Sequence, residues 1–157
     1  MRKKIICLVL VMMLILGTMG STALAAGHRP GNVISTDVWW DINTIFNLEY
    51  ERRVNRAMSL YVNPFFVPIG ITLLGTKVGT KIYFLGTAPE GLWIGGFGMV
   101  TYASVLGASA VSFAIAGNAG YKLFLSSILT VEANVGYGYT FGGSGSLTWG
   151  AHIGLGL

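Results

Sequence analysis

Apolar and polar residues alternate with a period of two along most of the chain. The clearest run is residues 146–157, where odd-numbered positions carry leucine, tryptophan, alanine and isoleucine and even-numbered positions carry serine, threonine, glycine and histidine. Because successive side chains of a β-strand point to opposite faces, this run predicts a strand with one apolar and one polar face. Residues 129–141 repeat the pattern, and the glycine- and serine-rich stretch between the two runs predicts a hairpin turn.

Earlier segments alternate in the same way with less regularity, so that the sequence predicts eight strands in all. The predicted strands are residues 33–41, 45–54, 57–66, 76–85, 91–104, 111–123, 129–141 and 146–157. Strands of this length are long enough to cross a bilayer at a tilt. The outward connections, residues 67–75 and 104–110, are short and apolar, unlike long polar loops used for adhesion.

Composition decides which face of these strands meets water. The chain has 157 residues, of which 53% are hydrophobic and only 10% charged, whereas soluble domains carry about a quarter charged residues. The polar face consists mainly of glycine, serine, threonine and asparagine, which suits a packed interior better than the charged exterior of a soluble barrel. The apolar face suits lipid, and an open sheet edge in hydrocarbon would leave backbone groups unpaired. The predicted fold is all-β, an eight-stranded antiparallel up-and-down transmembrane β-barrel.

A polytopic helical membrane protein is the main alternative fold. Residues 91–121 contain no charged residue, and hydropathy alone would assign a transmembrane helix to them. Their glycine content and the strict alternation of the flanking segments favour strands instead.

The amino terminus has the features of an export signal. Arg2, Lys3 and Lys4 precede an apolar core at residues 5–16, and the Ala-Leu-Ala sequence at 23–25 is a cleavage motif. We therefore expect residues 1–25 to be a cleaved signal peptide, with an uncleaved anchor as the alternative, and residues 26–157 to be the barrel domain. The predicted mature chain keeps seven basic and six acidic residues and no cysteine. The high isoelectric point of the whole chain thus gives no indication of a nucleic-acid partner.

Several charged residues fall on the predicted lumenal face, where charges must be paired or strongly solvated. We predict a structural salt-bridge cluster that holds the barrel shut, with ion selectivity in a pore as the alternative role. A hairpin centred near residue 126 would place Lys122 opposite Thr130, and one near residue 55 would place Glu51 opposite Ser59. The predicted cluster consists of Glu49, Glu51, Arg53, Lys77, Lys81, Lys122 and Glu132.

The sequence offers little catalytic chemistry. The histidines are His28, in the leading segment of the predicted mature chain, and His152, on the polar face of the last strand, where we expect a hydrogen-bonded filler. Neither begins the His-x-Ser-Asn motif of lipid-deacylating barrels, and no nucleophile, metal or phosphate motif occurs. We expect no catalytic residue, no metal and no cofactor.

Three segments carry a resemblance to a known family: residues 47–55 (NLEYERRVN), residues 81–98 (KIYFLGTAPEGLWIGGFG) and the final alternating strand. With them the chain resembles the small OmpA/OmpX-like bacterial outer-membrane barrels. The resemblance implies a lipid-embedded barrel in the outer membrane, inserted by the outer-membrane assembly machinery, and it transfers no catalytic residue. The chain departs from the family in ending with Leu157, where phenylalanine is common.

The function expected from these features is that of a small, monomeric integral outer-membrane protein with a structural or envelope role. A narrow-lumen channel and a lipid-modifying outer-membrane enzyme are the functional alternatives.

Overall fold

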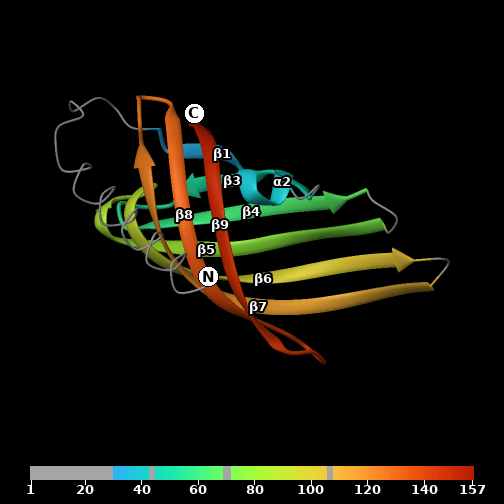
Figure 1. Ribbon diagram of the computed structural model, residues 1–157. Coiled ribbons are helices and arrows are strands. Elements are labelled where there is room, and N and C mark those ends of the chain that lie inside the picture. Colours follow the sequence, from blue (N-terminus) through green and yellow to red (C-terminus); the bar gives the residue numbers. More distant parts are fainter. Residues whose placement is uncertain (1–29, 43–44, 69–71, 106–107) are drawn as a thin grey trace, which may run out of the picture.

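The computed structural model describes residues 30–42, 45–68, 72–105 and 108–157 (Figure 1). The predicted signal peptide and His28 lie outside these residues, so the division at residue 25 stays a prediction. The described elements are β1 (Asn32–Asp37), α2 (Val38–Ile42), β2 (Phe46–Asn47), β3 (Glu49–Arg53), β4 (Met58–Val67), β5 (Thr72–Thr87), β6 (Glu90–Val105), β7 (Ala108–Phe124), β8 (Leu129–Thr140) and β9 (Gly145–Gly156).

The strands form one closed antiparallel sheet. β2 and β3 both pair with β4, so they act as two parts of a single strand of the wall. From β3 the order runs through β1, β9, β8, β7 and β6 to β5, and pairing of β5 with β4 closes the circle. The predicted eight-stranded antiparallel β-barrel is confirmed.

The helical alternative is wrong, because the described residues between 91 and 121 lie in the paired strands β6 and β7. Their many glycines allow close approach between strands. A Cβ atom at Gly95 would lie only 2.2 Å from the backbone oxygen of Thr80. In the described part of the chain, no helix has the length and apolarity needed to span a membrane.

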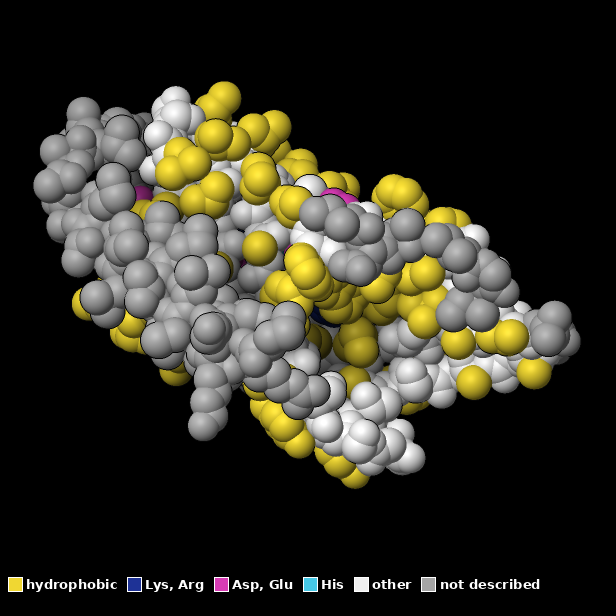
Figure 2. All heavy atoms as spheres, in the orientation of Figure 1, with side chains coloured by type: hydrophobic (Ala, Val, Ile, Leu, Met, Phe, Trp, Pro, Cys, Tyr) yellow, Lys and Arg dark blue, Asp and Glu magenta, His cyan; other side chains and the backbone are white. Residues whose placement is uncertain are grey.

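From β2 to β9 the apolar face of the wall strands points outward, whereas Val33 of β1 is fully buried. Leu147 is 70% exposed, whereas Lys81 and Glu132 are only 1% and 5% exposed. On the face that Figure 2 shows, hydrophobic side chains are spread over the barrel wall with few charged side chains among them. Because no other described part of the protein covers these hydrophobic side chains, the surface that they form suits the hydrocarbon of a membrane. The predicted asymmetry, apolar outside and polar inside, is confirmed.

Two predicted connections are largely strand. β5 begins at Thr72, where it pairs with Ser104, and β6 continues to Val105, opposite Ala108 at the start of β7. The alternation of apolar and polar residues is weak in these stretches, but backbone hydrogen bonds to the adjacent strand extend the paired strands β5, β6 and β7.

The first predicted strand ends early. Residues 33–41 were expected to be extended, but β1 stops at Asp37 and the next five residues form the short helix α2. The carboxylate of Asp37 accepts hydrogen bonds from the backbone N–H groups of Trp39 and Trp40 at 3.1 and 3.4 Å, as a helix N-cap does. Asp37 thus favours a helix where the side-chain alternation favours a strand.

α2 takes the place of a strand in the wall beside β9. The β1–β9 ladder ends at the pair Asp37 and His152, and α2 packs against β9 beyond that point (Figure 1). The ring of Trp39 lies 4.4 Å from that of Trp149 on the outer side. Trp40 instead contacts Phe65, whose side chain is buried in the lumen, with ring centroids 6.0 Å apart.

The outward orientation of the apolar face can be tested with Val135, near the middle of β8. Replacing Val135 with arginine should lower the free energy of unfolding in lipid by about 2–4 kcal/mol, because a charge would then lie in hydrocarbon. Equilibrium denaturant titration in vesicles measures this. Ser144→Arg, in the β8–β9 turn, is the matched control and should change stability little. Equal effects of the two substitutions would contradict the assigned orientation.

Candidate functional site: a buried ion-pair cluster

Five charged side chains meet inside the barrel. Glu49 and Glu51 come from β3, Lys81 from β5, Lys122 from β7 and Glu132 from β8. All five are buried. They lie on alternate positions of their strands, and closure of the sheet brings these separate positions to one level of the lumen.

Two ammonium groups bridge three carboxylates in this cluster. Lys81 Nζ lies 2.8 Å from Glu49 Oε1, 3.1 Å from Glu51 Oε2 and 2.9 Å from Glu132 Oε2. Lys122 Nζ pairs with Glu51 and lies 2.7 Å from Glu132 Oε2. Each lysine therefore joins two or more strands across the lumen.

Neutral groups complete the surroundings of the cluster. The hydroxyl of Tyr83 donates a hydrogen bond of 2.7 Å to Glu51 Oε1, and Ser59 donates to the same oxygen at 2.5 Å. The ammonium of Lys81 also lies about 5 Å from the ring centroids of Tyr61 and Trp93. These donors and rings compensate charges that have lost their water. The alternation of apolar and polar residues gave no indication that Ser59, Tyr61 and Tyr83 take part in the cluster.

The observed registers differ from the predicted ones. Lys122 lies directly opposite Glu132, and Glu51 lies opposite Tyr61. In each hairpin the predicted partner, Thr130 or Ser59, is two residues away from the observed one. A shift of two residues preserves the face of every side chain, so the error left the inward set unchanged.

Two members of the predicted cluster lie elsewhere. Arg53 is at the end of β3, where its backbone N–H bonds to the carbonyl of Gly31. Lys77 is inside the barrel, but its Nζ lies 3.8 Å from the centroid of the Trp40 ring. Neither residue forms an ion pair with any residue that the structure describes. The reason is spacing: Lys77 lies four residues, two inward positions, from Lys81 along β5.

The three carboxylates of the cluster have the spacing of a metal-binding group. One oxygen from each of Glu49, Glu51 and Glu132 lies within 4.8 Å of the others. The ammonium groups of Lys81 and Lys122 already supply the positive charge at this place. A divalent cation would have to compete with both lysines.

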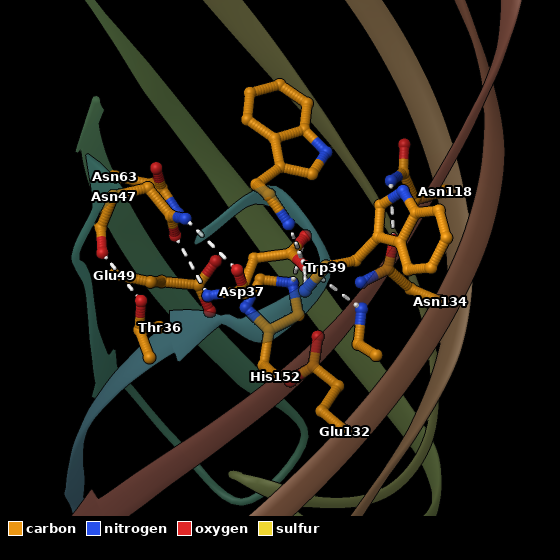
Figure 3. A network of polar contacts seen from close by, with 12 residues as sticks. Thr36, Asp37, Trp39, Asn47, Glu49, Asn63, Asn118, Glu132, Asn134 and His152 are labelled. Carbon is orange, nitrogen blue, oxygen red and sulfur yellow. Dashed lines mark hydrogen bonds and ion pairs between the residues drawn. The ribbon is translucent and has the colours of Figure 1, made fainter. Parts of the chain in front are cut away.

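A second polar network lies where β1, β9 and α2 meet (Figure 3). His152 Nε2 lies 3.6 Å from Asp37 Oδ2, and the backbone N–H of Ala151 bonds to Asp37 Oδ1 at 3.4 Å. The backbone N–H of Asp37 bonds to Asn47 Oδ1 at 3.0 Å. Asp37 thus connects β9, β2 and α2 beyond the last ladder pair.

A closed barrel with an apolar wall and an ion-paired lumen defines a class, the eight-stranded membrane β-barrel of the outer-membrane type. Among solved structures, the chain is similar to the N-terminal β-barrel domain of Pseudomonas aeruginosa OprF. The TM-score is 0.60 at 11% sequence identity, and the match covers 83% of this chain and 100% of that chain. This likeness confirms the predicted resemblance to small outer-membrane barrels at the level of the fold.

Comparisons by sequence add nothing to this. No protein-family model matches the chain, and no curated protein matches it.

Removing one partner of the cluster should destabilise the barrel. We expect Lys81→Met to lower the free energy of unfolding by about 3–5 kcal/mol, because three buried carboxylates would share one remaining ammonium. Denaturant titration of the folded protein in detergent measures this. Arg53→Gln removes a positive charge outside the cluster and should change stability by less than about 0.5 kcal/mol. Unchanged unfolding of the Lys81→Met variant would show that the cluster is not a stabilising element.

Proposed function

We propose that the protein is a small structural component of the bacterial outer membrane whose lumen is closed by the ion-pair cluster. The observation that carries this proposal is the position of Lys81 and Lys122, each of which joins carboxylates of other wall strands across the lumen. A barrel tied across its centre resists opening and distortion of the wall.

The geometry disfavours the alternative of an ion channel. A conducting path needs a continuous column of water, whereas the side chains of the cluster are buried and in contact with one another. Breaking a buried pair costs about 3–5 kcal/mol, which would make an open lumen about 150- to 4,000-fold rarer than the closed one.

The proposed location and partners rest on the export signal predicted from the sequence together with the fold. A chain exported by that signal, with an apolar barrel exterior, fits the lipid of the outer membrane and insertion by its assembly machinery. We propose a monomer, because the closed wall completes the strand pairing within a single chain. No catalytic activity is included in the proposal. A lipid-modifying activity would appear as a mass change in lipid A between cells with and without the protein.

The closed lumen can be tested by electrical recording. The full chain, exported and folded in cells and then purified, should give no stepwise conductance in planar lipid bilayers, because the cluster leaves no water-filled path. The Lys81→Ala variant removes the residue that contacts all three carboxylates and should give measurable conductance steps. Stepwise conductance by the wild-type protein would contradict the proposal.

The proposed location has its own test. Density-gradient separation of the envelope should recover the protein with the outer membrane, and its gel migration should shift on heating, as expected of a folded barrel. Recovery with the inner membrane would overturn the assignment.

A further inference from the structure

Beside the ion-pair cluster, on the side of α2, the lumen contains a cavity of about 110 Å³. Aromatic rings form much of its lining, with Trp40 from α2, Trp93 and Phe97 from β6, and Tyr61 from β4. Lys77 also lines it. This volume is below the about 150 Å³ of an engineered apolar cavity that binds benzene, so the space suits at most one small ring or a short chain.

Lys77 is the unused cation of this cavity. Its ammonium lies 3.8 Å from the ring centroid of Trp40 and 5.7 Å from that of Phe97. No carboxylate of the described residues lies within ion-pair distance, and no hydrogen bond of this ammonium to them is formed. An ammonium that has rings below it and three free N–H groups is a recognition element for an anion.

Buried polar atoms without partners point to the same place. Trp93 and Asn63 are both 2% exposed, and neither Trp93 Nε1 nor Asn63 Oδ1 forms a hydrogen bond with the described residues. The same holds for His152 Nδ1 and Asn118 Oδ1. All four residues line the cavity. Native structures leave few buried polar atoms unpaired. The N–H of Trp93 is a donor that suits a ligand oxygen, whereas Asn63 Oδ1 and Asn118 Oδ1 are acceptors that suit a water or a ligand hydroxyl.

The acidic residues that line the cavity are already engaged. Glu49 accepts from Lys81 at 2.8 Å. Asp37 accepts from the backbone N–H groups of Trp39, Trp40 and Ala151. Lys77 is therefore the lysine of the described lining that forms no direct ion pair within the chain. The nearby carboxylates still repel a second negative charge, which favours a monoanion over a dianion.

From this geometry we infer that the cavity is a binding site for a small monocarboxylate with a flat apolar or short-chain body. The carboxylate would bind the ammonium of Lys77, and the body would lie among the rings of Trp40, Trp93 and Phe97. The buried N–H of Trp93 supplies a further donor to a ligand oxygen. This inference goes beyond the proposed structural role, since a closed barrel has no need of a ligand site.

Benzoate is a suitable probe because it combines one carboxylate with one ring. We expect saturable binding to the full-length protein folded in detergent, measured by titration calorimetry and by the fluorescence of the lining tryptophans. Lys77→Gln should weaken binding at least about tenfold, since the charge-assisted hydrogen bond is lost. Arg53→Gln, which removes the same charge outside the cavity, should bind benzoate as the wild type does. Benzamide, the uncharged analogue, should also bind at least about tenfold more weakly than benzoate.

Three outcomes would overturn the inference: no saturable benzoate binding, equal affinity for benzoate and benzamide, or unchanged affinity in a folded Lys77→Gln variant. Heat-modifiable gel migration verifies folding of each variant. Should Lys77→Gln fail to fold, Trp93→Phe removes one donor while retaining a ring, and a severalfold loss of benzoate affinity is then the expected result, with no loss overturning the inference. Conductance by the wild-type barrel would disprove the closed lumen without affecting these titrations, so the two proposals can fail separately.

Discussion

Backbone hydrogen bonding in hydrocarbon is the constraint on which this structure depends. A strand edge facing lipid would leave its N–H and C=O groups without any partner, at a cost of several kcal/mol for each group. Pairing of β4 with β5 removes the last such edge and closes the sheet into a barrel. Closure in turn determines whether each position carries an apolar or a polar side chain, because alternate positions must face lipid and the others a narrow lumen. The apolar exterior and the polar interior are therefore two results of the same requirement.

The narrow lumen then decides how charged residues can be accommodated. An eight-stranded barrel has an interior just wide enough for side chains to fill, so a carboxylate placed there loses most of its water. Glu51 is tolerated because Lys81, Lys122, Tyr83 and Ser59 surround it with donors. The three carboxylates and two ammonium groups leave one negative charge in excess, and the hydroxyl donors offset part of it. Such a network stabilises the barrel only while it is complete, since a half-satisfied one leaves a buried charge.

Period-two alternation predicted most of the fold because it is a local property of each strand and shows directly which side chains share a face. It could not predict register. Lys122 and Glu132 were placed on the correct face yet two positions apart, because the turn between them leaves the alternation unchanged. Alternation also failed at α2, where the N-cap formed by Asp37 favours a helix over a continued strand. The depth of a residue along the axis of the barrel could not be predicted either. For this reason Lys77 was grouped with charges that lie two inward positions away. Depth depends on the stagger of the strands, which no single segment encodes.

The buried lysines at the two levels of the lumen have different neighbours, because the adjacent elements place different side chains beside them. At the level of Lys81, β3 and β8 supply glutamates, so the ammonium is neutralised within the protein. At the level of Lys77, β6 supplies Phe97 and α2 supplies Trp40, so the ammonium meets ring faces instead of carboxylates. A ring face offsets an ammonium only partly, by about 0.5–2 kcal/mol, far less than a buried carboxylate does. Had residues 38–42 continued β1 as a strand, alternation would have turned Trp39 instead of Trp40 into the lumen. The helix at α2 is thus the element that places the ring of Trp40 beside the ammonium of Lys77, at a level of the lumen where that ammonium forms no direct ion pair with the described residues.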